Sequence, residues 1–171
     1  MAIEGVVQPA VIPIEPGLRL RSFDGKFDFA LRWYQDPEVV YLVDGVHEPY
    51  SPEKLLRMYA YLYKRGELYF IEVEKNGAYV PVGDVTFWAD DMPIVIGDPA
   101  CRGRGIGRKV IGALIERGRQ LGYDTLRVGE IYDWNEASRK CFMSMGFEPC
   151  EKTEKGSRYM LCLTEGDSAS C

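Results

Sequence analysis

The sequence predicts an α+β domain built on a mixed β-sheet that carries helices on its faces. Segments in which apolar residues alternate, as in strands, are interspersed with segments in which apolar residues recur at helical spacing. In chain order they read β-α-α-β-β-β-α-β-α-β-β, which indicates neighbouring strands covered by intervening helices. The 171 residues suffice for one domain, which we place at 18–163, between an extended arm at 1–17 and a polar tail at 164–171.

The first fifty residues are expected to form one strand and one helix. Prolines punctuate residues 1–17, which favours an arm lying extended on the domain. Leucine and arginine alternate over 18–21, as in a strand. Apolar residues at helical spacing predict a helix over 26–35, which Asp36-Pro37 would end, and a polar, aromatic loop follows over 41–50.

The middle of the chain contains a strong helix start and a hairpin. Ser51-Pro52-Glu53 places a hydroxyl at the N-cap, proline at the first helical position and an acid in the first turn. Gly66 ends this helix. Alternating strands are then expected over 68–74 and 80–88, joined as an antiparallel hairpin by a turn at 75–77, with a further strand over 94–97.

The last third is expected to alternate helices and strands. Apolar residues between 110 and 121 recur on one face of a helix that packs on a sheet. The remaining elements are a strand over 126–131, a helix over 135–145, and a closing hairpin of strands 147–151 and 158–163.

Composition and charge exclude several function classes. A net charge of −5 disfavours a nucleic-acid binder, since neutralising phosphates requires a basic surface. No apolar run is long enough to cross a membrane, and the prolines and Glu4 near the N-terminus do not fit a signal peptide. Five cysteines without a C-x-x-C pair and a single histidine, His47, do not match a zinc site or a disulfide framework, so a reducing cytoplasm is expected.

The segment around which the chain is organised is Arg102-Gly103-Arg104-Gly105-Ile106-Gly107-Arg108. It follows a short apolar strand and opens directly into a helix. The first N–H groups of a helix have no intrahelical partner, and glycines let the backbone approach an anion closely. We therefore expect a phosphate or pyrophosphate here. A helix with a tight entry turn and no ligand is the alternative.

Two nucleotide-binding motifs fail on this loop. A Walker loop requires G-x-x-x-x-G-K-[ST], but the sixth position from Gly103 is Arg108, and Lys109 is followed by Val110. A dinucleotide fingerprint requires G-x-G-x-x-G. Gly105 and Gly107 fit its first two glycines, but Val110 stands at the position of the third. The pattern that fits is R-x-x-G-x-G, which begins at Arg102.

This loop resembles the coenzyme A pyrophosphate loop of the GNAT superfamily of N-acetyltransferases. The stretch from Asn135 to Phe147 is similar to the second motif of that family, N-x-x-[AS] followed by G-F. The resemblance covers about residues 18–163. It implies a central, twisted, mostly antiparallel sheet of about seven strands with helices on both faces, acetyl-coenzyme A as donor, a primary amine as acceptor, and no metal.

The resemblance also implies which residues hold the cofactor. The strand before the loop would splay from its neighbour, and its exposed backbone groups would pair with pantetheine and polarise the thioester carbonyl. Gly97 suits a close backbone approach. The cofactor-binding residues expected from the two motifs are Ile96, Gly97, Arg102, Gly103, Arg104, Gly105, Ile106, Gly107, Arg108, Asn135 and Ser138.

The chain departs from the common family pattern at Phe142. Many members place there, seven residues after the motif asparagine, a tyrosine that serves the departing thiolate. Ser138 is the replacement we expect, unless it is only a serine of the first helical turn. The serine followed by an apolar residue at the tyrosine position resembles the branch that acetylates ribosomal-protein N-termini, as do 18–21 and 33–39.

Acidic residues supply the remaining candidates. Asp84 and Asp98 are the expected catalytic carboxylates, because acids near the splay of the sheet are well placed to deprotonate an amine. Glu72 and Glu130 are further candidates for the base. For each of the four, the alternative is a solvated surface acid with no catalytic role. In the loop over 41–50, the residues expected to bind a cationic acceptor are Asp44, His47 and Glu48.

The sequence thus predicts a cytoplasmic, acetyl-coenzyme A-dependent N-acetyltransferase. The acceptor would be a peptide or protein N-terminus, or a small cationic amine such as an aminoglycoside or polyamine. A non-catalytic acyl-coenzyme A-binding sensor is the alternative that the missing tyrosine favours. We expect a monomer or homodimer that binds neither nucleic acid nor membrane.

Overall fold

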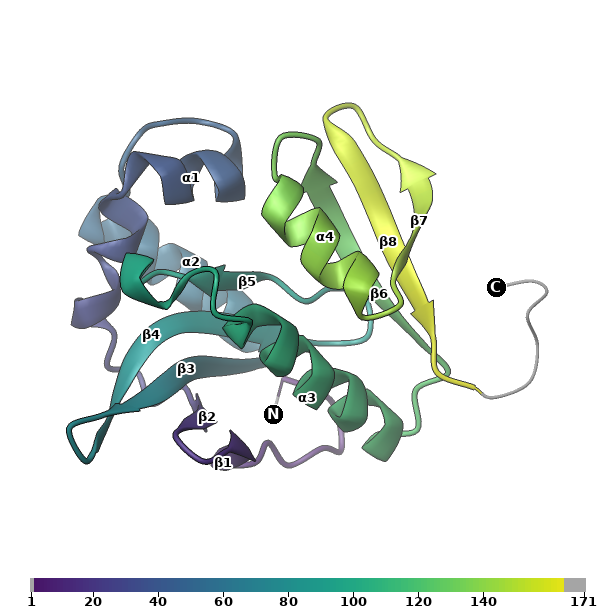
Figure 1. The fold of residues 1–171 in the computed structure, drawn as a ribbon, viewed down its shortest axis with the longest axis horizontal. Coiled ribbons are helices and arrows are strands. Elements are labelled where there is room, and N and C mark those ends of the chain that lie inside the picture. The colour runs from purple at the N-terminus through teal and green to yellow at the C-terminus, as the bar shows by residue number, and fades with distance from the viewer. Residues whose placement is uncertain (1, 165–171) are drawn as a thin grey trace.

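A computed structural model of the protein describes residues 2–164 and shows eight strands in two sheets (Figure 1). The first sheet has the order β1-β2-β3-β4-β5, and the second has the order β6-β8-β7. The first sheet consists of β1 (Val11–Glu15), β2 (Leu18–Ser22), β3 (Glu67–Lys75), β4 (Ala78–Phe87) and β5 (Ile94–Ile96). The second consists of β6 (Thr125–Tyr132), β7 (Glu148–Lys152) and β8 (Gly156–Cys162).

Every strand pair in both sheets is antiparallel. The predicted hairpin is confirmed: β3 pairs with β4 from Glu67↔Phe87 to Lys75↔Ala78. The turn between them uses Asn76 and Gly77, both with positive φ, as a tight hairpin requires. The structure has one strand more than predicted, because β1 forms within the arm 1–17 and pairs with β2. Apart from Thr164, the predicted tail lies outside the described residues.

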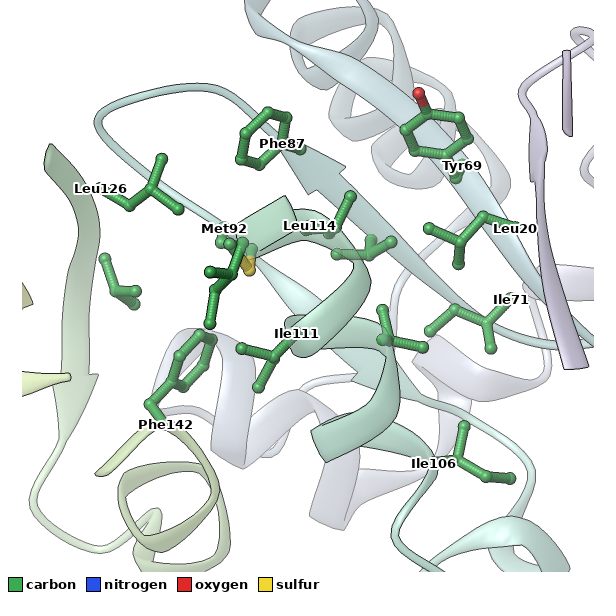
Figure 2. Packing of buried hydrophobic residues seen from close by; sticks show 14 of the residues in the cluster. Leu20, Tyr69, Ile71, Phe87, Met92, Ile106, Ile111, Leu114, Leu126 and Phe142 are labelled. Carbon is green, nitrogen blue, oxygen red and sulfur yellow. The ribbon is translucent and has the colours of Figure 1, made fainter. Parts of the chain in front are cut away.

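Helices cover both faces of the first sheet, and the last helix lies beside the second sheet (Figure 1). They are α1 (Pro37–Asp44), α2 (Pro52–Arg65), α3 (Ile106–Gln120) and α4 (Glu136–Ser144), with three 3-10 turns, η1 (Asp28–Ala30), η2 (Trp33–Gln35) and η3 (Pro99–Cys101). Because side chains alternate along a strand, β3 serves two cores. Tyr69 and Ile71 pack with α3, whereas Leu68 and Phe70 pack with α2. Figure 2 shows the core on the α3 face.

The helix predicted over 26–35 is wrong. Only two 3-10 turns form there, and Asp36-Pro37 begins α1 where it was expected to end a helix. The Asp36 side chain accepts a hydrogen bond from the N–H of Glu38, and Pro37 takes the first helical position, where its missing N–H has no consequence. The same signal was correctly interpreted at Ser51, whose hydroxyl accepts from the N–H of Lys54 at 3.1 Å and caps α2.

Candidate active site

The glycine loop presents a row of backbone donors at the start of α3. Gly103 and Gly105 have φ values of 71° and 76°, a left-handed conformation in which a side chain is strained. The first N–H of the loop and helix to find an acceptor is that of Lys109, which donates to the carbonyl of Gly105. The N–H groups from Gly103 to Arg108 make no hydrogen bond among residues 2–164. Unpaired N–H groups at the start of a helix are an arrangement that can bind an anion.

The three arginines of the loop have different surroundings. The Arg102 guanidinium donates to the carbonyls of Ile96 at 3.0 Å and Gly97 at 3.3 Å, and it lies 3.6 Å from the Asp36 carboxylate. Arg102 therefore fastens the loop to the end of β5. Arg104 and Arg108 are exposed and form no ion pair within the described chain, so they remain available to an anion.

On the edge of β5 that faces away from β4, the N–H of Ile96 has no partner among residues 2–164, although the Ile96 carbonyl accepts from Arg102. Thr86 donates to the carbonyl of Pro93, and Gly97 and Asp98 both donate to the carbonyl of Val82. Because bonded positions alternate along an antiparallel pair, the N–H of Ile96 faces away from β4, towards the gap before β6. The N–H groups of Gly97 and Asp98 are used within the sheet, so of these three backbone donors only that of Ile96 stays free of a partner within residues 2–164.

Position 97 must be glycine because the side chain of Trp33 packs directly against its backbone. A Cβ at this position would lie 2.1 Å from Cγ of Trp33, whose ring packs on the backbone at the end of β5. Its φ is not in the left-handed region. The close approach expected at Gly97 is therefore made by the Trp33 indole, which is buried.

The second motif forms the start of α4. The Asn135 side chain caps this helix by accepting from the N–H of Ser138 at 3.2 Å. Ser138 is half-buried, and its hydroxyl makes no hydrogen bond within residues 2–164. Phe142 is only 1% exposed and packs edge-on against Phe147 at 5.3 Å between ring centroids. It belongs to the core on the α3 face (Figure 2), so the position of the missing tyrosine has become a packing position.

Asp84 is the most distinctive acid of the site. It is 3% exposed, in β4 opposite Val95 of β5, and its Oδ2 accepts hydrogen bonds from the hydroxyls of Tyr34 and Tyr59, each at 2.8 Å. No hydrogen bond reaches Oδ1 within the described residues. Burial raises the pKa of Asp84 to about 6, although the two tyrosine hydrogen bonds oppose the shift. A carboxylate poised near neutrality can take a proton from an amine.

The other three acids have environments that do not suit a base. Asp98 caps η3 and forms an ion pair with Lys75 at 2.8 Å, which lowers its pKa. Glu72 is buried between two arginines of β2 at 2.6 and 2.7 Å. Glu130 is exposed on β6. Among the candidates, only Asp84 combines burial, a raised pKa and a place beside β5.

The predicted acceptor residues lie at the end of α1 and beyond it. Asp44 accepts from the Tyr50 hydroxyl at 2.7 Å and from the Lys54 ammonium at 3.1 Å. The ring of Tyr50 lies 5.0 Å from that of Tyr34, which connects Asp44 to the surroundings of Asp84. His47 and Glu48 are exposed, and the structure gives Glu48 no partner among residues 2–164.

An aromatic column joins this region to the second sheet. Tyr132 at the end of β6 stacks on Trp134 at 4.5 Å, and Trp134 stacks on Tyr41 at 5.1 Å. Tyr41 stacks in turn on His47 at 4.5 Å, and the indole N–H of Trp134 donates to the Tyr41 carbonyl. Burial, followed by the carboxylates of Glu130 and Asp44, raises the pKa of Tyr132. The column therefore runs from the end of β6 to the loop after α1, close to Asp44.

Sequence reasoning missed the tyrosines around Asp84 and the aromatic column. Tyr34 and Tyr59 lie 50 and 25 residues from Asp84 along the chain. Both rings are buried in the core on the α2 face, and an apolar environment for the rings says nothing about the partners of their hydroxyls. Only the packing of η2 and α2 on β4 brings the hydroxyls to one carboxylate oxygen. No spacing signal in the sequence could have indicated this.

The described part of the chain has no group of three or more His, Cys, Asp or Glu side chains that could hold a metal ion. It also contains no helix with the length and apolar character needed to cross a bilayer.

Solved structures share this fold at low sequence identity. A domain from Methanocaldococcus jannaschii superposes with a TM-score of 0.74 at 21% identity, covering 87% of this chain and 100% of that one. YncA from Salmonella typhimurium, solved with acetyl-CoA, gives 0.60 at 18% identity over 90% and 99% of the chains. Spermidine N-acetyltransferase from Vibrio cholerae, in complex with CoA and spermine, gives 0.66 at 15% identity over 85% and 95%.

None of the curated proteins matches this sequence significantly. A family model does: that of the acetyltransferase (GNAT) family matches residues 27–147, which include the glycine loop, Asp84 and the capped start of α4. A site that binds acetyl-coenzyme A is expected to have two diverging sheets and free N–H donors at the start of a helix. This structure has both features. The chain belongs to the GNAT family of acetyl-coenzyme A-dependent acetyltransferases.

Proposed function

We propose that this protein transfers the acetyl group of acetyl-coenzyme A directly to the primary amine of a small cationic acceptor. The observation that carries the proposal is the buried Asp84, held by two tyrosine hydroxyls in β4, next to the strand whose Ile96 N–H is free. A proton acceptor and an unpaired backbone donor thus occupy adjacent strands.

The glycine loop and β5 supply the binding of the donor. The free N–H groups from Gly103 to Arg108, with the Arg104 and Arg108 side chains, would hold the pyrophosphate. The Ile96 N–H would donate to the thioester carbonyl and stabilise the negative charge that develops there. Bound acetyl-coenzyme A supplies an activated acyl group. Arg102 holds the loop on the strand, so that these two sets of donors keep a fixed separation.

Asp84 would accept the proton that the acceptor amine must lose. The amine nitrogen forms a bond to the acetyl carbon, the carbon–sulfur bond breaks, and the thiolate takes a proton. The free Oδ1 of Asp84 is the atom we assign to the amine proton, and the unbonded hydroxyl of Ser138 is the donor we assign to the thiolate. Asp98 is not assigned a role, because its ion pair with Lys75 lowers its pKa.

The acceptor class is inferred from the face on which Asp84 lies. The aromatic column, with Tyr132 at its end, borders this region with ring surfaces, which attract ammonium groups. Asp44 and the ring of Tyr50 already bind one ammonium group, that of Lys54, so this part of the region suits a cation. The similarity in fold to a protein solved with spermine supports a polyamine-like acceptor. His47 and Glu48 would contribute at the rim.

An α-amine of a protein N-terminus is the second candidate acceptor. It is favoured by Ser138 followed by Phe142, the feature in which the chain resembles the ribosomal-protein branch. The comparisons support the family and not that branch. The stretch 33–39 has a structural role here, since Trp33 packs on Gly97 and Asp36 caps α1. The predicted cytoplasmic location and the monomeric or homodimeric state stay predictions.

The test measures release of free thiol from acetyl-coenzyme A in the presence of polyamines, aminoglycosides and peptides with free N-termini. We expect turnover with at least one cationic amine, reduced in Ser138→Ala and strongly reduced in Asp84→Asn. Turnover only with peptides would select the second acceptor. Acetyl-coenzyme A binding without thiol release from any acceptor would favour a sensor and overturn the proposed reaction.

A further inference from the structure

The two sheets meet at a tight turn between β4 and β5. The backbones of Trp88 and Asp91 bond to each other in both directions, at 3.2 and 3.4 Å, and close this turn. Along the chain the turn follows β4, and β5 follows the turn. In space the turn contacts β6, because the N–H of Arg127 donates to the carbonyl of Ala89. The turn therefore connects the first sheet, which contains β5, with the second sheet, which contains β6 (Figure 1).

The turn occupies the edge of β6 that β5 would otherwise pair with. The N–H of Arg127 donates to the carbonyl of Ala89 at 2.8 Å, and the N–H of Gly129 donates to Oδ1 of Asp91 at 2.8 Å. Residues two apart in a strand direct their N–H groups to the same edge. One backbone carbonyl and one side-chain carboxylate thus take the donors that a β5–β6 ladder would use.

The contact between Asp91 and Gly129 is close. A Cβ at position 129 would lie 2.8 Å from Oδ2 of Asp91, so a larger residue here would push the carboxylate out of its present position. Oδ1 of Asp91 also accepts from the N–H of Met92 at 2.8 Å, which fixes the carboxylate on its own turn. Burial raises the pKa of Asp91, as expected for a carboxylate held in an interior position.

We propose that Asp91 is a positioning residue that sets the width of the cofactor slot. By holding Gly129 of β6 on the turn, its carboxylate keeps β6 from pairing with β5 and leaves the Ile96 N–H free for acetyl-coenzyme A. Asp91 acts through the backbone of β6 and touches no reacting atom. The inference concerns donor binding alone, so it depends neither on the acceptor nor on the role of Asp84.

The experiment measures the Kd of acetyl-coenzyme A by calorimetry, without acceptor, together with the melting temperature and the exchange rate of the Gly129 amide. Asp91→Ala should weaken binding about tenfold and speed Gly129 exchange, because a donor loses its acceptor. Asp91→Asn, which keeps an oxygen in place, should stay within about threefold of the parent. Asp90→Ala is the matched control: Asp90 is the exposed neighbour in the same turn, and its ion pair with Arg127, at 3.9 Å between two exposed side chains, contributes little, so its removal should change neither quantity.

A double-mutant cycle separates positioning from mere stability. Gly129→Ala should weaken binding as Asp91→Ala does, and the double variant should be no weaker than either, because both changes break one contact. A lowered melting temperature with unchanged Kd in Asp91→Ala would overturn the proposal, as would additive losses or an Asp91→Asn variant as weak as Asp91→Ala. If Asp91→Ala does not fold, Gly129→Ala compared with Asp91→Asn decides, since only the former should lose affinity.

Discussion

Replacing Asp84 by asparagine should abolish most of the activity while leaving the protein at least as stable. Asparagine keeps the shape and an oxygen that accepts from Tyr34 and Tyr59, but it cannot take a proton. General base catalysis contributes about 10²- to 10⁴-fold in rate, and we expect kcat/KM for the amine to fall by that factor. The Kd of acetyl-coenzyme A should change less than about twofold, because Asp84 does not face the glycine loop.

The raised pKa gives the sign and size of the stability effect. Moving the Asp84 pKa from 3.8 to about 6 means that ionising the carboxyl in the folded protein costs about 3 kcal/mol more than in the unfolded chain. The folded state binds the proton more tightly, so this contribution is present below about pH 4 and is lost as pH rises through about 6. Asp84→Asn lacks this slope, and its free energy of unfolding at pH 8 should equal or exceed that of the parent.

The assay is a pH series of kcat/KM and of urea unfolding for parent and variant. The parent rate should rise with pH through about 6, as Asp84 loses its proton, and the residual rate of the variant should lack that limb. Glu72→Gln is the control: it alters another buried carboxylate of the same sheet, should lower stability, and should keep the limb. An Asp84→Asn variant within about threefold of the parent rate, or one that keeps the same acidic limb, would refute the reasoning.

Three further changes test the framework of the site. Gly97→Ala places a methyl 2.1 Å from Trp33, and the overpacking should lower the free energy of unfolding by about 2 kcal/mol or more. Urea unfolding measures this, and an unchanged urea midpoint would contradict the close contact between Gly97 and Trp33. Gly105→Ala meets open space but strains a φ of 76°, so a loss of about 1 kcal/mol is expected, with weaker acetyl-coenzyme A binding in calorimetry. Trp134→Ala removes the ring that Tyr132 stacks on, and should raise the acceptor KM but not the acetyl-coenzyme A KM; equal changes in both would argue against an acceptor wall.

The sequence by itself determined the features that depend on a few neighbouring residues. The cap at Ser51, the hairpin turn at Asn76-Gly77 and the glycine loop before α3 each follow from local backbone chemistry, and each lies where it was expected. The donor was indicated for the same reason, since an anion cradle is built from consecutive N–H groups. The local signal at Asp36-Pro37 was misread because the same dipeptide can end one helix or begin another, and here it begins α1.

The tertiary structure alone decided which acid can act as a base and how the slot is held open. The sequence offers Asp84 and Asp98 equally as candidate bases. Packing, however, buries Asp84 beside two tyrosines and pairs Asp98 with Lys75. Asp91 reaches Gly129 across 38 residues of chain. A carboxyl group's pKa and role depend on the dielectric and the donors around it, and these come from elements that meet only when the sheets and helices have packed.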